Sequence, residues 1–461
     1  MDERLNTSYR EDIHTFSVAT NNTYYTENKW ILKDLFDKSL KAKHGHYSLF
    51  DIQFELLGHI LASYSAYQKY LRWESLFARA IKNLKSNKSP IERIKLAQSR
   101  FEFMRNSAIA AQFFLGQLRS IGDGIAWWFL NYDRATLRLL AEHSYVSVPE
   151  PGKGLYTEIY QCAELASKES PFILNSITNF LRFGDITIYD KSTDTYRLVE
   201  VKAGKIQTSR SLRRQADRLA LIQEALETGS HNIAHPDIIH TKITSKLPLL
   251  TYVKILETAM YEAREKLVSS RVLGDYLSFG LCYVKKIISL PEAQSAQISE
   301  DTINRCSSIK KTERDFILSF LGSILHTVHF SRMLAPYTIF PIDSDLRFSL
   351  ISGDYLLLSQ INVSGLARWL INRGWEVEVL SLPDKLPDLS KSPYVYMPIL
   401  RVRKPNSRLE VEIPLDIIGG AAIELWMPES IERAIQAVLS YGYSKNAYTV
   451  NYPNTGKYAW D

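Results

Sequence analysis

The segment GDITIYDKSTDTYRLVEVKAGK, residues 184–205, constrains the fold more than any other part of the chain. Asp185 opens a run in which isoleucines alternate with other residues. A polar turn over 190–195 then leads into a second alternating run over 196–203. Alternation with a period of two on both sides of a polar turn predicts an antiparallel β-hairpin. The chain must therefore contain this hairpin and cover its apolar face.

The second predicted strand carries an acidic and a basic residue on one face. Successive side chains of a strand point to opposite faces, so Glu200 and Lys202 share one face while Val199 and Val201 share the other. The valines can anchor the strand in a core. A carboxylate and an ammonium group are then left side by side on the opposite face.

Two carboxylates and a lysine suit the hydrolysis of a phosphodiester bond. Asp185 and Glu200 offer the hard oxygen ligands that Mg²⁺ prefers, with Mn²⁺ as an alternative ion, and the Val201 carbonyl is a further candidate ligand. Such an ion neutralises the scissile phosphate and acidifies a bound water. Lys202 would position or deprotonate that water and add positive charge as the transition state forms.

This arrangement resembles the PD-(D/E)xK nuclease superfamily, also called the restriction-endonuclease-like fold. The resemblance covers roughly a sixth of the chain, residues 155–230, and rests on Gly184-Asp185 and Glu200-Val201-Lys202. Glycine stands where the motif has proline. The resemblance implies an αββα core and an endonuclease that cuts DNA.

Members of the superfamily characteristically begin with a helix that carries another acidic residue. In this chain the helix is YTEIYQCAEL, residues 156–165, and either Glu158 or Glu164 could be that acid. We take Glu158 as the first choice for both a catalytic residue and a metal ligand.

A second helix, predicted over residues 207–228, follows the hairpin. At about 100° per residue, Gln215 falls inside an apolar sector formed by Leu212, Ala216, Leu219, Ile222 and Leu226. A buried amide needs a hydrogen-bond partner. That partner is either a catalytic water, a phosphate or Lys202, or else only the backbone. Several nucleases of the superfamily resemble this chain in placing a glutamine on the helix after the ExK strand.

Four basic residues are predicted to bind the phosphates of a nucleic-acid backbone. Three recur at four-residue spacing on the other side of the helix and one precedes it: Arg210, Arg214, Arg218 and Lys205.

The chain divides into three predicted regions. Residues 1–145 form a helical domain whose first 25 residues are a loose arm, and residues 150–232 form the nuclease core. Residues 235–461 form an α/β domain of unknown role. In that domain we expect a helix over 313–334, a strand over 337–342 and a final helix from Pro428 to Gly442.

Length and composition limit the class of protein. With 461 residues the chain can bury a large hydrophobic core, so its fold does not need a disulfide bond or a structural metal ion for stability. The three cysteines lie far apart, as expected in a reducing compartment. The polar N-terminus is unlike a secretory signal, and no apolar run is long enough to span a bilayer. We expect a cytoplasmic protein with no membrane partner.

Two minor features leave alternatives open. The run from residue 78 to residue 100 carries seven basic residues. It either binds a nucleic-acid backbone or simply consists of solvated helix ends. Gly122-Asp123-Gly124 lacks the preceding strand of a dinucleotide-binding motif and is a helix start or a kink.

These features predict a Mg²⁺-dependent DNA endonuclease. By analogy with similar cores, its role would be bacterial restriction or anti-phage defence, with a second copy or other defence proteins as partners. RNA is the less favoured substrate. The alternatives are a non-catalytic nucleic-acid-binding scaffold that retains the fold, and an RNA-cleaving effector.

Overall fold

The computed structural model describes residues 15–141, 153–181, 183–201, 210–231, 239–287, 290, 315–322, 336–380, 397–441 and 446–452. Within these residues the protein is a mixed α/β structure with several small, mostly antiparallel sheets, as the sequence predicts. No described helix combines the length and the hydropathy needed to cross a membrane.

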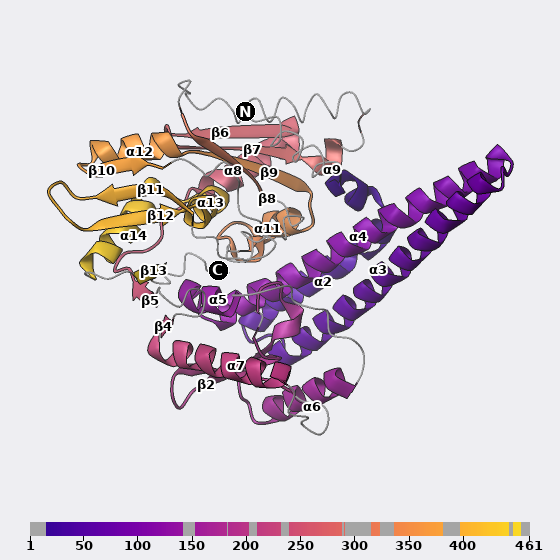
Figure 1. Ribbon diagram of the computed structural model, residues 1–461, viewed down its shortest axis with the longest axis horizontal. Helices are drawn as coiled ribbons and strands as arrows, with labels where there is room; N and C mark the ends of the chain where they lie inside the picture. The colour runs from indigo at the N-terminus through magenta and orange to yellow at the C-terminus, as the bar shows by residue number, and fades with distance from the viewer. Residues whose placement is uncertain are drawn as a thin grey trace.

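Long helices dominate the N-terminal region, as predicted (Figure 1). They are α2 (Thr23–Lys43), α3 (Leu49–Ser86), α4 (Ile91–Phe129) and the short α5 (Arg134–Ala141). The side chain of Ser48 caps α3 by accepting from the Asp51 N–H, and Pro90 directly precedes α4. The chain therefore breaks between α3 and α4 at Pro90, which cannot donate a backbone hydrogen bond.

Two predictions for this region are wrong. Residues 15–25 are almost entirely helical rather than loose. Helix α4 does not break at Gly122-Asp123-Gly124 but continues to Phe129. The glycines serve close packing instead of a break, because a Cβ on Gly122 would lie 2.1 Å from the Ile177 oxygen and one on Gly124 would lie 2.3 Å from Thr338 Oγ1.

The middle region contains the predicted hairpin between two helices. Its strands are β2 (Ile186–Asp190) and β3 (Thr195–Val199), flanked by α6 (Lys153–Ser167) and α7 (Arg210–Thr228). A third strand that the sequence did not reveal, β1 (Phe172–Leu174), pairs with β2 and leads into the 3-10 turn η1 (Asn175–Ile177). The antiparallel sheet therefore has the order β1-β2-β3 where two strands were expected.

A four-stranded antiparallel sheet forms the centre of the C-terminal region. Its order is β6 (Val268–Leu273), β7 (Leu277–Tyr283), β9 (Tyr355–Asn362) and β8 (Ile317–Gly322). Strand β9 is buried along its whole length. The helix predicted over 313–334 is wrong where it is described, since residues 317–322 pair with β9 as β8. The predicted strand over 337–342 instead begins with the 3-10 turn η3 (Tyr337–Ile339).

Helices and two further small sheets complete the C-terminal region. The helices are α8 (Val253–Lys266), α9 (Val284–Ile287), α11 (Ser344–Ile351), α12 (Val363–Asn372), α13 (Leu415–Ile423) and α14 (Pro428–Ser440). Pro428 occupies the first turn of α14, as predicted. One sheet joins β10 (Glu376–Val379), β11 (Pro398–Arg403) and β12 (Glu410–Pro414), and the other joins β4 (Ser230–His231), β5 (Ile239–Thr244) and β13 (Asn446–Asn451).

The three regions pack against one another. Buried apolar side chains from all of them belong to one continuous hydrophobic cluster. The boundary between the first two predicted regions lies outside the described residues, and the second region is described from Lys153, where α6 begins. Figure 1 shows α6, β2 and α7 together at the edge of the molecule opposite β6 and β7.

Candidate active site

The register of the hairpin brings Asp185 next to Glu200. Ile186 pairs with Val199, so Asp185 and Glu200 are the next residues out from the last pair of the ladder. The Asp185 N–H donates to the Val199 carbonyl at 2.8 Å, and Asp185 Oδ2 accepts from the Val201 N–H at 2.6 Å. Glu200 therefore lies between two residues that are both hydrogen-bonded to Asp185.

Gly184 has a conformation that explains the missing proline of the motif. Its φ is +70°, a left-handed value that proline cannot adopt and that glycine adopts without strain. A Cβ at this position would lie 2.9 Å from the Val199 carbonyl oxygen. Glycine thus lets the chain turn sharply into β2 and hold Asp185 against the end of β3.

Asn175, which the sequence did not single out, supports the same turn from the other side. Its backbone N–H donates to the Asp185 carbonyl at 2.9 Å, and its side-chain amide donates to the Phe183 carbonyl at 2.8 Å. Its side-chain oxygen accepts from Thr187 Oγ1 at 2.9 Å. Asn175 is 2% exposed, so these bonds are shielded from water and hold Asp185 in a defined place.

Glu158, on α6, is the helix acid that faces the two hairpin carboxylates. Partial burial, together with the negative charges of Asp185 and Glu200, raises the pKa of Glu158 from 4.5 to about 7. Glu164, the alternative, is exposed and forms an ion pair with Lys168 at 2.6 Å. Of the two candidate acids, Glu158 is therefore the one whose charge interacts with Asp185 and Glu200, and its role as a site residue stays a prediction.

Cys162 lies one turn further along α6 and is fully buried. Burial and the nearby charge of Glu158 raise the pKa of its thiol to about 12. A thiol with so high a pKa is an inert part of the core rather than a nucleophile.

Two helices of the N-terminal region, α3 and α4, make hydrogen bonds to the segments that precede β2. Gln53, within the apolar stripe of α3, accepts from the Leu174 N–H at 2.7 Å and donates to the Phe172 carbonyl at 3.2 Å, and so binds the open edge of β1. Asp123 on α4 accepts from the backbone and side-chain amides of Asn179 at 2.7 and 2.8 Å. A polar residue in an apolar helical stripe is the one sequence signal that could have revealed Gln53.

Helix α7 attaches to the sheet through a different glutamine from the predicted one. Gln223 Oε1 accepts from the Leu198 N–H at 3.1 Å, and its Nε2 donates to the Tyr196 carbonyl at 3.0 Å. Ile222 is fully buried, as predicted, but Ala216 is exposed and does not belong to the packing face. The guanidinium of Arg218 lies 5.5 Å from the centre of the Phe183 ring, next to the turn that carries Asp185.

Several predicted site residues lie outside the described part of the chain. Lys202 and Lys205 are among them, and the side chains of Arg210, Arg214 and Gln215 are not described. The described residues therefore include the three predicted acids and one of the four predicted phosphate-binding residues, Arg218.

The carboxylates of Glu158, Asp185 and Glu200 are suited to a divalent ion that keeps part of its hydration shell. Among the described residues, no three His, Cys, Asp or Glu side chains form a ready-made metal cage. Mg²⁺ does not require one, since it usually keeps several waters and binds one or two carboxylates together with substrate phosphates. The donors present are carboxylates, and burial together with the negative charges of Asp185 and Glu200 raises the pKa of Glu158. A hard cation would relieve that repulsion.

No protein-family model matches this chain, and neither a curated protein nor a solved structure is significantly similar to it. The function has to be argued from the residues of the site themselves.

Proposed function

We propose that this protein is a metal-dependent nuclease of the restriction-endonuclease-like type that hydrolyses phosphodiester bonds in DNA. One observation carries the proposal: Asp185 and Glu200 lie next to each other at the open end of one hairpin, and Glu158 of α6 is near enough for both of their charges to raise its pKa. Negative charges held close together repel one another and destabilise the folded protein. A bound cation and a phosphate substrate would make the cluster favourable.

Each residue has a proposed role. Asp185 and Glu200 would hold Mg²⁺ or Mn²⁺, with the Val201 carbonyl and Glu158 as further ligands. When bound, the ion would neutralise charge on the phosphate and lower the pKa of a water molecule. Lys202 would orient the attacking water and balance charge in the transition state, and Gln215 would help to position that water.

Two features of the described residues support an accessible, rigid site. Asp185 and Glu200 are half-exposed, so a substrate can reach them. The turn that carries Asp185 is held by hydrogen bonds to Asn175, Val199 and Val201. A site held in this way keeps its acids in place without reorganisation during the reaction.

The proposed substrate is DNA, bound through its phosphates. Arg218 lies beside the site, and Arg210, Arg214 and Lys205 are close to it in the sequence. RNA is the alternative substrate, and a non-catalytic nucleic-acid-binding protein is the alternative function.

Cleavage of plasmid DNA with and without Mg²⁺ tests the proposal. Asp185→Asn is the sharpest variant, because asparagine keeps an oxygen to accept from the Val201 N–H and removes only the charge. We expect each of three variants to lower the cleavage rate at least about 100-fold: Asp185→Asn, Glu200→Gln and Lys202→Ala. The control is Glu164→Gln, on the same helix as Glu158, and it should leave the cleavage rate unchanged.

Three results would contradict parts of the proposal. If Asp185→Asn and Lys202→Ala cleave as fast as the wild type, the catalytic assignment is wrong. If the wild type binds DNA but never cleaves it, the protein is a non-catalytic binder. Cleavage of RNA without cleavage of DNA would overturn the choice of substrate.

A further inference from the structure

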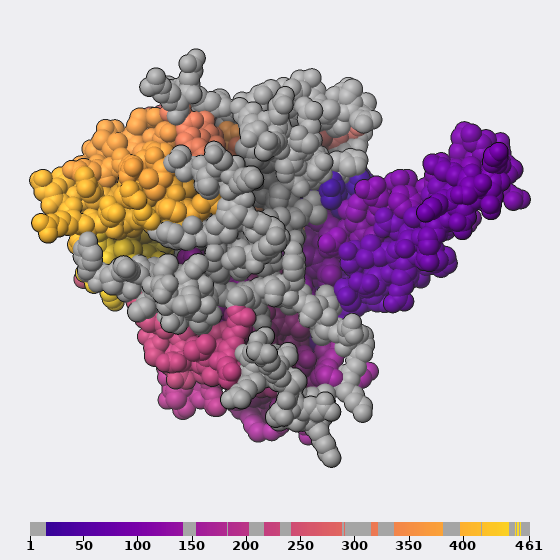
Figure 2. Space-filling view, viewed as in Figure 1, coloured from indigo at the N-terminus to yellow at the C-terminus, as the bar shows by residue number. Residues whose placement is uncertain are grey.

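The far end of the α3–α4 hairpin is a second charged surface, separate from the candidate active site. We call residues 69–105 the basic arm. In Figure 1 it projects from the body beyond the end of α2, and in the space-filling view of Figure 2 it stands clear of the rest of the molecule. Near its base, the Tyr24 ring of α2 lies edge-on to Tyr70 at 5.9 Å.

Positive charge is concentrated in this arm. It holds ten basic residues and three acidic ones, a net charge of +7, whereas the whole chain has a net charge of only +6. The rest of the chain is therefore slightly acidic. Every basic side chain of the arm is exposed, and none forms an ion pair with an acid in the described structure: Lys69, Arg72, Arg79, Lys82, Lys85, Lys88, Arg93, Lys95, Arg100 and Arg105.

The charge surrounds the arm rather than covering one side of it. At about 100° per residue, Arg79 and Lys82 point away from the seam between α3 and α4. Lys95 lies opposite the seam on α4, while Arg93 and Arg100 flank it. An interfacial membrane helix needs one continuous apolar face. Here the partly buried apolar residues of each helix face the other helix, and the exposed apolar side chains are interspersed with lysines and arginines, so they form no such face. This argues against a membrane surface as the partner. The exposed apolar side chains of the arm are Trp73, Leu76, Ile91, Leu96 and Phe103.

The arm also exposes large apolar side chains. Trp73 and Phe103 are 44% and 54% exposed. Ser63 donates to the Ala111 carbonyl at 3.1 Å, and this antiparallel register puts the two aromatic residues within about one helical turn of each other along the arm. Exposed aromatic residues among unpaired basic ones are typical of a contact surface rather than of an inert solvated helix.

The dimensions of the arm match a nucleic-acid duplex. From residue 69 to the end of α3 the helix rises about 26 Å. Duplex DNA carries one negative charge per about 1.7 Å of axis, so this length faces about fifteen phosphates. A two-helix hairpin is too wide to enter the major groove, which admits a single helix. It would instead lie along the backbone and contact phosphates.

We infer that the basic arm binds the phosphate backbone of duplex nucleic acid without reading its sequence. The inference does not depend on the proposed cleavage reaction, because the arm would bind a duplex whether or not the hairpin site cuts it. The arm would give the protein affinity for long duplexes that the residues around Asp185 alone would not provide.

Binding of the full chain to a labelled duplex of about 40 base pairs, in EDTA and over a range of salt concentrations, tests this inference. The arm variant is Lys82→Gln, Lys85→Gln and Lys95→Gln. The matched control removes three exposed lysines of the body: Lys41→Gln, Lys246→Gln and Lys285→Gln. Glutamine keeps the helix propensity of lysine, so both variants should fold. Their thermal midpoints verify this.

We expect the arm variant to bind about tenfold more weakly at 100 mM salt and to lower the slope of log affinity against log salt by about 2 to 3. The control should stay within about twofold of the wild type. EDTA prevents cleavage, so a failure of the nuclease proposal leaves this measurement unaffected.

Equal binding by the arm variant and the control would overturn the inference. So would a wild type that does not bind the duplex, or whose binding does not depend on salt. Vesicles containing phosphatidylserine provide the remaining comparison. If the arm variant loses vesicle binding but keeps duplex binding, the arm is a membrane contact and the inference is wrong.

Discussion

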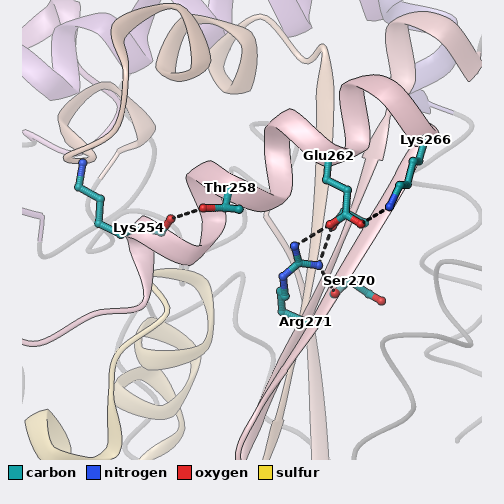
Figure 3. A network of polar contacts seen from close by, with 7 residues as sticks. Lys254, Thr258, Glu262, Lys266, Ser270 and Arg271 are labelled. Atoms are coloured by element: carbon teal, nitrogen blue, oxygen red, sulfur yellow. Dashed lines mark hydrogen bonds and ion pairs between the residues drawn. The ribbon is translucent and has the colours of Figure 1, made fainter.

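Glu158 on α6 and Glu262 on α8 are both partly exposed glutamates on amphipathic helices, yet their surroundings are opposite. Glu262 accepts from Lys266 at 2.9 Å, Arg271 at 2.6 Å and Ser269 at 2.9 Å, and Figure 3 shows it between the two cations. These bonds lower the pKa of Glu262 from 4.5 to about 2. Glu158 instead faces two other carboxylates, which help to raise its pKa to about 7.

The difference separates a structural carboxylate from a candidate functional one. The neighbours of Glu262 join α8 to β6 and satisfy its charge within the protein. The described carboxylates near Glu158 disfavour its charged form, and a cation bound beside them would lower that cost. Perturbed carboxylates in this second situation are more common at functional sites. Three measurements test whether the two glutamates differ in this way.

The largest expected effect is stabilisation by Mg²⁺ at pH 8. An ion that binds only the folded protein adds about 2.7 kcal/mol at about one hundred times its dissociation constant. We expect this increase in the free energy of unfolding both in the wild type and in Glu262→Gln. Thermal or urea unfolding measures it. Removal of the ion with EDTA should reverse it.

The matched loss-of-binding variant is Asp185→Asn combined with Glu200→Gln, which should not respond to Mg²⁺. A response equal to that of the wild type would mean that the ion binds elsewhere and that the carboxylate cluster has another purpose.

The second effect is the pH dependence of stability without divalent ions. The pKa of Glu158 is higher in the folded state, about 7, than its ordinary value of 4.5. Its favourable contribution is therefore present below pH 4.5 and is lost as the pH rises through about 7. Glu158→Gln should equal the wild type near pH 5 and exceed its free energy of unfolding by about 1 kcal/mol at pH 8, since partial exposure screens the charge.

Glu164→Gln is the control on the same helix, because Glu164 is exposed and paired with Lys168. It should show no such change between pH 5 and pH 8. If Glu158→Gln is no more stable than the wild type at pH 8, then Glu158 does not face the other two acids as described.

The smallest effect has the opposite sign and belongs to Glu262. Its pKa is lowered to about 2, so its contribution to stability is present above pH 4.5 and is lost as the pH falls through about 2. Glu262→Gln should lose about 0.5 kcal/mol at pH 7, and the difference should vanish near pH 2.

Urea unfolding of Glu262→Gln beside Glu265→Gln, an exposed neighbour on α8, would measure this difference. A loss that persists unchanged at pH 2 would assign the effect to packing rather than to charge.

Local patterns predicted the hairpin well. Alternation depends on residues that are close in sequence, and β2 forms where it indicates. The second strand was predicted over 196–203, but β3 ends at Val199, so Glu200 and Val201 follow the strand instead of lying within it. The same reasoning failed for residues 317–322, where the spacing of apolar residues resembled a helix. The buried strand β9 needs partners on both edges, and pairing with it overrides the local preference.

The sequence alone predicted the hairpin, the two acids that it carries and the concentration of basic residues along α3 and α4. These depend on spacing along the chain. The folded structure was needed to show that Glu158 rather than Glu164 interacts with the hairpin acids, that Gln223 attaches α7 to β3, and that α4 continues through Gly122 in close contact with Ile177. Those outcomes depend on contacts between residues distant in sequence, which periodicity does not encode.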